Sequence, residues 1–403
     1  MTILHVTPYY TPAWAYGPVP ARVAQLAQAQ ASAGHHVTVL TTDAMAPHER
    51  LPPGESTLDG VRVIRVPNIS GSTRMWFGCS TPIGMRRRAS QLFRTTAFDV
   101  VHLHELVTIE NLRVGAVIPA TVPIVVSMHG QLTADPAISP RACQLWSSAG
   151  GHRLRTRIRT VVAGSTGEAD ALARPMGTPM ALLGGASVRV VPDGVDLTPF
   201  TTAPERSAAR DALGLGTGPV VLVPGPVSNE PGTRALVEAL GSLLPQFPAM
   251  RLVCAGTDSG GHDTLAAFAR SLGLDSQLRV TGYVAPAVIP RLLAAADLVV
   301  LPLDESARTS FIVGAMAMGR PLLGTPVTLL AEASDAALCL DSAEPSPHEW
   351  AAAIRGVLTD AAWMGRLREA GRLAAARRAW PAVASSWDEL YEDARQRRLH
   401  ADR

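Results

Sequence analysis

Three histidines stand at or near the ends of two neighbouring strand-like runs, where side chains can act on a bound ligand. His102 and His104 lie in "VHLHEL", just before Glu105, and His129 lies in "SMHGQL". Alternate residues of a strand point to the same face, so His102 and His104 should lie together. Ligands of parallel α/β sheets bind at the carboxyl ends of the strands. His104 and His129 are therefore candidate catalytic residues, and packing is the stronger interpretation of His102.

A metal site is the alternative interpretation of these histidines. Imidazole is a common zinc ligand, but a zinc site in a protein needs at least three protein ligands. No third ligand follows at a helpful spacing. We therefore expect no bound metal.

Two loops that contain glycine and lead into helices are candidates for anion binding. "AYGPVPARV" places Gly17 ahead of a helix with Arg22 in its first turn, and "VPGPVSNEPGTRAL" places Gly225 at a strand end ahead of Arg234. Glycine permits close approach of the backbone, and N–H groups at a helix N-terminus favour anions. The chain contains no lysine, so arginine, histidine or backbone N–H groups must meet any phosphate charge.

Residues 301–321, "LPLDESARTSFIVGAMAMGRP", form a third junction of this kind. A strand-like run ends in proline, an acidic loop follows, and a small-residue helix over Ile312–Met318 ends in "GRP". Gly314 occupies a helix position that looks buried, where glycine costs about 1 kcal/mol relative to alanine. The polar residues of this junction that are candidates for ligand contact are Glu305, Ser306, Arg308, Thr309 and Ser310.

Short apolar runs alternate with helical stretches, which predicts a doubly wound α/β fold that occurs twice. Several runs are apolar almost throughout, as in strands buried on both faces of a parallel sheet. The expected strands of the first set are 3–7, 36–41, 61–66, 100–104, 124–128, 160–163 and 189–191. Those of the second set are 220–223, 251–254, 278–281 and 298–301, with intervening helices at 234–244, 264–272, 288–295 and 350–359.

The two sets predict two Rossmann-like domains that face a cleft. We expect the first domain at residues 1–196, a linker rich in Pro, Thr, Gly and Ala at 197–218, and the second domain at 219–379. An amphipathic helix at 380–403 is expected to cross back to the first domain.

Composition supports an ordinary globular protein. The 403 residues are 47% hydrophobic and 17% charged, and the net charge of +2 indicates no nucleic-acid partner. The four cysteines form no CxxC pair, which favours free thiols in a reducing compartment. We expect no signal peptide, no transmembrane segment and a cytoplasmic location, with the oligomeric state left open.

These motifs resemble the retaining, two-domain glycosyltransferases of the large family 4 group, which have the GT-B fold. The similarity covers nearly the whole chain. It rests on the opening "TPYYTPAWAYGPVPARVAQLAQAQASAGHHVTVLTT", on "FDVVHLHEL" and "VVSMHG", and on "VVPDGVDLTPF" before the second domain. In the second half it rests on "VTGYVAPAVIPRLLAAADLVVLPL" and "AMAMGRPLLGT".

The resemblance implies transfer of a sugar from a nucleoside diphosphate sugar to a small-molecule acceptor, with retention and without an obligatory metal or cofactor. It places His104 beside the donor sugar. It places Gly282, Tyr283 and Val284 at the nucleobase. The residues expected on the acceptor side are Tyr16, Arg22 and Glu105.

The donor motifs depart from the family pattern. Where the family has two cations for the diphosphate, this chain has Pro226 and Pro231, and the family's two spaced glutamates become Ser306 and Gly314. Arg234 or Arg308 could replace the missing cations through a bidentate guanidinium. Each is otherwise a solvated surface residue.

Two functions remain open. The first is an active glycosyltransferase with a rebuilt donor site, in a specialised natural-product or glycoconjugate pathway such as antibiotic biosynthesis, with an O, N or S acceptor. The second is a catalytically silent relative that acts as a partner or binding module. Peripheral membrane contact through the basic segments 84–94 and 152–159 is a weaker expectation than solvated helix faces.

Overall fold

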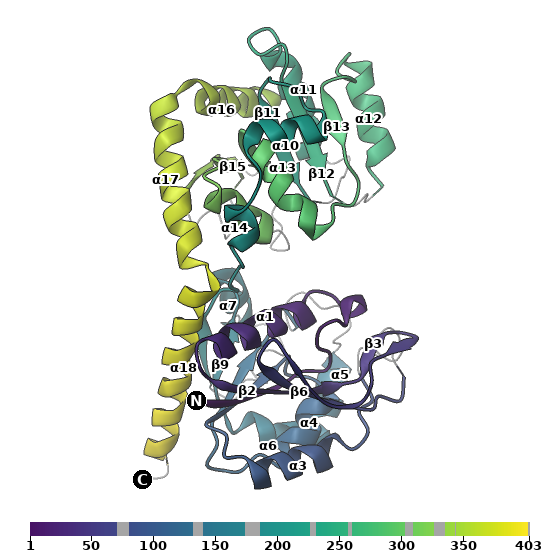
Figure 1. The fold of residues 1–403 in the computed structure, drawn as a ribbon, viewed down its shortest axis with the longest axis vertical. Coiled ribbons are helices and arrows are strands. Elements are labelled where there is room, and N and C mark those ends of the chain that lie inside the picture. Colours follow the sequence, from purple (N-terminus) through teal and green to yellow (C-terminus); the bar gives the residue numbers. More distant parts are fainter. Residues whose placement is uncertain are drawn as a thin grey trace. The chain divides into compact units, whose positions relative to one another are not determined.

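The computed structural model describes residues 1–70, 80–131, 140–173, 186–225, 231–256, 260–302, 309–325, 335–342 and 344–401. It divides into two compact units (Figure 1). Unit 1 comprises Met1–Gly194 together with Trp380–Arg403, and unit 2 comprises Val195–Ala379. No helix of the described residues is long and apolar enough to cross a bilayer.

Unit 1 is built on an eight-stranded sheet of order β10-β9-β8-β7-β1-β2-β6-β5, in which the described strands are parallel except at the β5–β6 pair. Its strands are β1 (Thr2–Val6), β2 (His36–Thr42), β5 (Gly54–Leu58), β6 (Val61–Val66), β7 (Val100–His104), β8 (Ile124–Ser127), β9 (Ile158–Ala163) and β10 (Ser187–Val190), beside a small β3 (Ala44–Ala46) and β4 (Glu49–Arg50) pair. Its helices are η1 (Trp14–Tyr16), α1 (Val19–Ser32), α3 (Met85–Thr95), α4 (Ile109–Gly115), α5 (Pro140–Trp146), η2 (Ser147–Gly151), α6 (His152–Arg155), α7 (Thr166–Ala173) and α18 (Trp380–Ala401).

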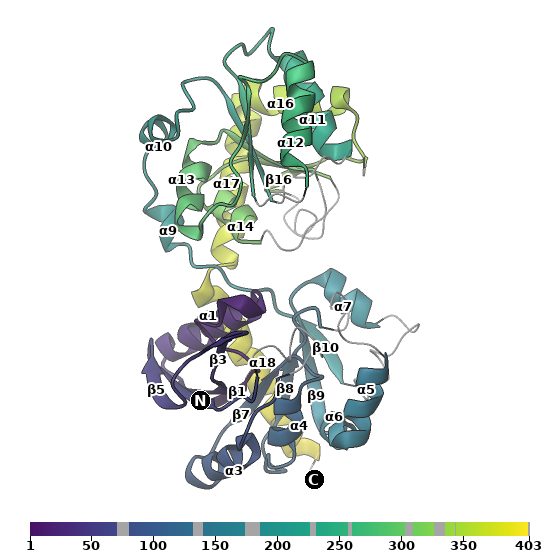
Figure 2. The ribbon, with the colours of Figure 1, turned by 90° about the vertical axis from the view of Figure 1, so that its right-hand side faces the viewer.

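Helices cover both faces of this sheet, because its central strands are apolar on both sides. Alternate strand residues such as Ile3 and Val100 pack against α1 and α18, and the residues between them, such as Leu4 and Val101, pack against α3 and α4. Helix α18 contacts α1 on the same face of the sheet, and in Figure 2 it runs behind the strands of unit 1. The C-terminal helix therefore packs on the N-terminal half of the chain, as the sequence predicted.

Unit 2 has a six-stranded parallel sheet of order β13-β12-β11-β14-β15-β16. Its strands are β11 (Val220–Pro224), β12 (Arg251–Ala255), β13 (Leu278–Val280), β14 (Leu298–Leu301), β15 (Leu322–Gly324) and β16 (Ala337–Cys339). Its helices are α9 (Thr198–Thr201), α10 (Arg206–Leu213), α11 (Pro231–Leu243), α12 (His262–Ser271), η3 (Pro286–Val288), α13 (Ile289–Ala295), α14 (Thr309–Ala317), α16 (Pro347–Thr359) and α17 (Ala361–Arg377). Two apolar cores, one on each face, complete this second doubly wound half.

The predicted α/β class with two Rossmann-like halves is confirmed. The structure also contains strands that the sequence did not predict. The prediction lacked β3, β4, β5, β15 and β16, of which all but β5 are only two or three residues long. The expected linker at 197–218 instead forms α9, α10 and their loops within unit 2, because Phe200, Ala209 and Leu215 are buried in its core.

Candidate functional site

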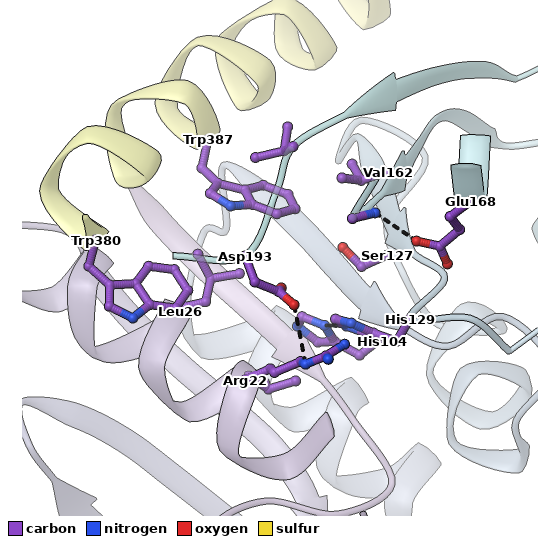
Figure 3. Close-up of a pocket in the computed structure, with 13 residues that line it drawn as sticks. Arg22, Leu26, His104, Ser127, His129, Val162, Glu168, Asp193, Trp380 and Trp387 are labelled. Carbon is purple, nitrogen blue, oxygen red and sulfur yellow. Dashed lines mark hydrogen bonds and ion pairs between the residues drawn. The ribbon is translucent and has the colours of Figure 1, made fainter. Parts of the chain in front are cut away.

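A pocket lies at the carboxyl ends of the central strands of unit 1. It is walled by α1 on one side and by the start of α18 on another (Figure 3). It encloses about 30 Å³ of space for the centre of a water molecule. Its lining residues are Arg22, Val23, Leu26, His104, Ser127, His129, Val162, Gly164, Glu168, Val191, Asp193, Trp380 and Trp387.

A chain of three hydrogen-bonded imidazoles leads from the core of unit 1 to this pocket. His5 Nδ1 lies 2.9 Å from His104 Nε2, and His104 Nδ1 lies 2.9 Å from His129 Nε2. His5 and His104 are fully buried, whereas His129 is partly exposed at the pocket. His129 is therefore the imidazole that a ligand can touch, and His104 lies behind it.

The hydrogen bond between His5 and Gln30, at the buried end of the row of imidazoles, determines the tautomers of all three rings. His5 Nε2 lies 2.7 Å from Gln30 Oε1, which can only accept, so this nitrogen carries the proton. For neutral rings His5 Nδ1 then accepts from His104 Nε2–H, and His104 Nδ1 accepts from His129 Nε2–H. The outer nitrogen of His129, Nδ1, is left with a lone pair that can accept a hydrogen bond from a hydroxyl group.

Burial keeps these rings neutral near pH 7. It lowers the pKa of His5 to about 4, although the hydrogen bond with Gln30 opposes the shift. The pKa of His104 and of His102 lies well below 6.5, first because of burial and then because of the neighbouring imidazoles. Burial also lowers the pKa of His129, and the nearby Asp193 carboxylate opposes that shift.

These shifts predict a specific pH dependence of stability. Below about pH 6.5 the unfolded chain takes up protons that the buried imidazoles do not, so the free energy of unfolding should fall as the pH decreases. Each such imidazole should contribute up to about 1.4 kcal/mol per pH unit between pH 6.5 and the folded-state pKa. Urea unfolding measured from pH 7.5 to pH 4.5 tests this window.

The variant His5→Gln should flatten that dependence by up to about 1.4 kcal/mol per pH unit, because one titrating ring is gone. His36→Gln, which replaces an exposed imidazole at the start of β2, is the matched control and should keep the wild-type slope. A His5→Gln slope equal to that of the wild type would contradict the prediction.

His102 belongs to the same buried network but turns toward α18. Its Nδ1 lies 2.8 Å from the Tyr391 hydroxyl, which also accepts a hydrogen bond from Gln30 Nε2 at 3.0 Å. Its Nε2 lies 2.8 Å from Ser127 Oγ. These contacts agree with the packing interpretation of His102, and they tie the C-terminal helix to the histidine network.

The loop that carries His129 is held by a carboxylate. Glu168, in the first turn of α7, accepts hydrogen bonds from Gly130 N at 2.5 Å and from Gly164 N at 2.7 Å. His129 has a φ of 52°, an unusual value for a residue with a side chain. Such backbone strain is typical of sites where the surrounding structure determines a side chain's position.

The remaining walls of the pocket are of opposite character. Arg22 Nε lies 3.2 Å from Asp193 Oδ2, and both side chains are about one third exposed (Figure 3). Facing them are the indole rings of Trp380 and Trp387. A pocket with an apolar wall and a few polar groups is suited to hold a hydroxylated ring with its apolar face on the aromatic side chains.

The structure brings together only some of the residues that the sequence predicted in unit 1. His104, His129 and Arg22 line the pocket, whereas the predicted Tyr16, Gly17 and Glu105 do not. The Tyr16 ring stacks on Tyr9 with their centroids 3.7 Å apart. The Glu105 side chain is buried beneath the surface. The contacts of Tyr16 and Glu105 with an acceptor, and of Gly17 with the donor, stay predictions.

Several lining residues were missed by the sequence analysis. They are Ser127, Gly164, Glu168, Asp193, Trp380 and Trp387, together with His5, Gln30 and Tyr391 behind the pocket. Glu168 could have been predicted from the sequence, since it is a carboxylate in the first turn of a helix that follows a buried strand. No sequence pattern indicated His5 or Tyr391, because only the strand order β8-β7-β1 and the position of α18 bring them to the site.

In unit 2, several predicted donor-side residues follow the carboxyl ends of strands. Gly225 directly follows β11, and Gly282 and Tyr283 follow β13. Tyr283 is 72% exposed, so its ring is available to a ligand, whereas Val284 packs against the core. Their predicted contact with a nucleobase is not tested by these positions.

The predicted cation Arg234 has a partner of its own. Its guanidinium lies over the Phe268 ring, 4.1 Å from the centroid, so a phosphate contact would have to break or share a cation–π interaction. Thr309 is the first residue of α14, as expected of a junction residue. Glu305, Ser306 and Arg308 lie outside the described residues, and so does the side chain of Ser310.

Gly314 is buried in α14 because another side chain occupies the space beside it. A Cβ atom at Gly314 would lie 2.4 Å from Cε1 and 2.6 Å from Cζ of Phe200. Phe200 belongs to α9, within the segment that the sequence predicted to be a linker. An aromatic ring therefore fills the position into which an acidic side chain at 314 would project.

Unit 1 contains a cluster of three histidines that the sequence did not predict. A third histidine does exist, because His5, His102 and His104 each place a ring nitrogen within 4.8 Å of the others. It was missed because His5 is 97 residues from His102 in the sequence and meets it only through the pairing of β1 with β7. Every nitrogen of these rings already has a hydrogen-bond partner, so a cation would have to displace several hydrogen bonds.

Comparison with known proteins finds family matches for both halves of the chain. Residues 19–194 match the family described as a "Glycosyl transferase 4-like domain", and residues 218–360 match "Glycosyl transferases group 1". Each half of the chain thus matches a glycosyltransferase family, and the two Rossmann-like halves match the GT-B fold.

Similar proteins of known sequence include a D-inositol 3-phosphate glycosyltransferase of Kineococcus radiotolerans, 34% identical over 53% of this chain and 53% of that protein. A phosphatidyl-myo-inositol mannosyltransferase of Mycolicibacterium smegmatis is 28% identical over 77% of this chain and 72% of that protein. The chain spans about half the length of the first of these relatives.

Among solved structures, a glycosyltransferase from Rickettsia africae is similar with a TM-score of 0.67 and 14% identity, and the match covers 98% of each chain. The Anabaena protein HepE in complex with UDP is similar with a TM-score of 0.67 and 16% identity, over 98% of this chain and 100% of that one. At these identities the likeness concerns the fold.

Proposed function

We propose that this GT-B protein transfers a sugar from a nucleoside diphosphate sugar to a small-molecule acceptor, with retention of the anomeric configuration. The observation that carries the proposal is the pocket of unit 1, in which the partly exposed His129 ends a chain of neutral imidazoles. Both family domains of glycosyltransferases are present in the same chain, which supports this activity.

In the proposed reaction the bond between the anomeric carbon and the β-phosphate oxygen breaks, and the leaving diphosphate takes the electron pair. The acceptor attacks from the same face, and its proton passes to the departing phosphate oxygen. The protein's share is positioning and electrostatic stabilisation. His129 Nδ1 would accept a hydrogen bond from a hydroxyl of the donor sugar, while Glu168 and His104 hold the His129 loop and ring in place.

The acceptor is the least determined part of the proposal. The relatives named above act on an inositol phosphate and a phosphatidylinositol by their names, which supports a polyhydroxylated acceptor. A specialised natural-product pathway, and a nitrogen or sulfur acceptor, stay predictions from the sequence. No metal or cofactor takes part in the proposed chemistry.

Calorimetric titration of the full chain with GDP, UDP, ADP and TDP tests the donor site. We expect one of them to bind, and Arg234→Ala or Arg308→Ala to weaken that binding at least tenfold, because a charge-assisted hydrogen bond contributes about 1.5–3 kcal/mol. Arg355→Ala, an exposed arginine on α16, is the control and should leave the affinity unchanged.

Absence of binding by all four nucleotides at millimolar concentration would reject the donor site. Unchanged affinity in both arginine variants would reject only the idea that they replace the missing cations.

The second candidate function is that of a catalytically silent partner or binding module. The Phe200 ring beside Gly314 favours it, because the ring leaves no room for an acidic side chain in α14. Release of sugar from the bound nucleotide sugar, measured by the appearance of free nucleoside diphosphate, separates the two. Binding without any turnover over a panel of acceptors would support the silent module.

A further inference from the structure

Unit 2 contains a hollow whose walls are mostly arginine. It has a volume of about 290 Å³ and is lined by Arg206, Met318, Gly319, Arg320, Arg368 and Arg372. The share of one water molecule in the liquid is about 30 Å³, so this space holds several waters or a diphosphate-sized ion. None of these residues belongs to the proposed donor site.

The hollow lies at the opposite edge of the sheet from the predicted donor loops. Helix α14 begins at Thr309 after the carboxyl end of β14 and ends at Ala317, before β15 begins. At about 1.5 Å per residue, its nine residues separate the two edges by about 13 Å. The arginines gather at the C-terminal end of α14 and on α10 and α17.

The architecture of the helix end brings the charges together. Gly319 has a φ of 61°, which lets the chain turn back so that Gly319 N and Arg320 N bond to Met316 O and Ala315 O. The Arg372 guanidinium lies against Gly319, with Nε 3.1 Å from the position of an added Cβ. The helix C-terminus favours cations beside it, but two of its last carbonyls are already paired.

Carboxylates neutralise only part of this charge. Among the described residues, the acidic partners of the lining arginines are Asp297 and Glu369. Asp297 is shared by Arg206 at 2.7 Å and by Arg210, and it also accepts from Val220 N. Glu369 approaches Arg372 only to 4.0 Å.

Two donors in the cluster have no hydrogen-bond partner among the residues that the structure describes. The Nε atoms of Arg320 and Arg368 are buried without a hydrogen bond. Burial lowers the pKa of Arg320, Asp297 opposes that shift, and the neighbouring arginines lower the pKa further. Buried donors next to like charges are costly unless an anion satisfies both.

We propose that the hollow lined by Arg206, Arg320, Arg368 and Arg372 is a second anion-binding site that takes a phosphate-bearing ligand. Guanidinium groups match phosphate oxygens with paired N–H donors, and several of them converge here on one space. The ligand would be either a free phosphate compound or the headgroup of an anionic lipid, which present the same chemistry. This site goes beyond the proposed transfer reaction and does not depend on it.

Calorimetric titration of the full chain with pyrophosphate tests the site. Arg368→Gln and Arg372→Gln should each weaken binding at least tenfold, whereas Arg366→Gln, exposed on the same helix, should stay within twofold of the wild type. Pyrophosphate bound at the donor loops would instead be weakened by Arg234→Ala, so the two variants separate the two sites. Loss of binding in Arg234→Ala but not in Arg368→Gln would place the anion at the donor loops and overturn the proposal.

Thermal unfolding without added anion separates binding from a structural role. Arg368→Gln should unfold at the same temperature as the wild type or higher, because the substitution relieves repulsion among the arginines. Pyrophosphate should raise the unfolding temperature of the wild type and not of the variant. A lower temperature for the variant, together with no effect of pyrophosphate on either protein, would show a structural cluster and overturn the proposal.

Sedimentation with vesicles distinguishes the two sources of phosphate. Binding to phosphatidic acid–phosphatidylcholine vesicles that is lost in Arg368→Gln would support a lipid headgroup. Pyrophosphate binding without vesicle binding would support a free phosphate compound. Binding of neither probe at millimolar phosphate would overturn the site.

Discussion

Replacing His129 by alanine should lower kcat for sugar transfer about 10²-fold, while the affinity for the nucleoside diphosphate changes little. The reason is that the variant removes the outer imidazole, which lines the pocket and whose Nδ1 keeps a lone pair that can accept a hydrogen bond from the sugar. A misplaced substrate in such a site costs about this factor. Initial rates at saturating donor and acceptor measure the loss.

His36→Ala, an exposed histidine of the same unit, is the matched control and should retain full activity. The pH profile gives a second readout. Because burial lowers the pKa of His129, its lone pair should persist, and kcat should show no loss from its protonation between pH 8 and pH 6.5. A His129→Ala enzyme with unchanged kcat would remove this residue from the proposed mechanism.

Replacing Gly314 by alanine should lower the free energy of unfolding of unit 2 by about 1–3 kcal/mol, the usual cost of overpacking a core. The new Cβ would lie 2.4–2.9 Å from three atoms of the Phe200 ring, which is itself only 9% exposed. Urea unfolding at pH 7.5 measures the change. The direction is opposite to the gain of about 1 kcal/mol that alanine brings to an unobstructed helix position.

Gly365→Ala supplies the control for that direction. Gly365 lies inside α17, and a Cβ there would meet nothing within 4 Å, so the variant should be neutral or more stable. In the background of Phe200→Ala, the substitution Gly314→Ala should lose its cost, which a double-mutant cycle shows as a coupling of about 1–3 kcal/mol. Equal destabilisation in both backgrounds would mean that Phe200 is not the cause.

Much of the fold could be predicted from the sequence, because each buried strand carries its own signal. Val220–Pro224 and Ile124–Ser127 are apolar almost throughout, which is what burial on both faces of a parallel sheet requires. The short β15 and β16 carry too few residues for such a signal. The segment 197–218 looked like a linker because it is rich in Pro, Thr, Gly and Ala, yet Phe200 packs into the core of unit 2.

The candidate site could be predicted only in part. The positions of His104 and His129 followed from strand ends, and Arg22 followed from its place in the first helix turn. Their order in depth did not follow, since only the structure shows that His104 is fully buried while His129 is partly exposed. Glu168 and Asp193 come from other parts of the chain, and no spacing rule connects them with the histidines.

The sequence by itself determined the two α/β halves, the histidines at the strand ends and the absence of the expected acid at position 314. Local apolar patterns and residue types encode these features within a few residues of one another. The tertiary structure alone decided which nitrogen of His129 keeps its lone pair. That choice depends on the orientation of the Gln30 amide, which bonds to Tyr391. Gln30 and Tyr391 are 361 residues apart and meet only through the packing of α18 on α1. The tertiary structure also decided what fills the space beside Gly314, since the contact with Phe200 depends on how α9 packs against α14.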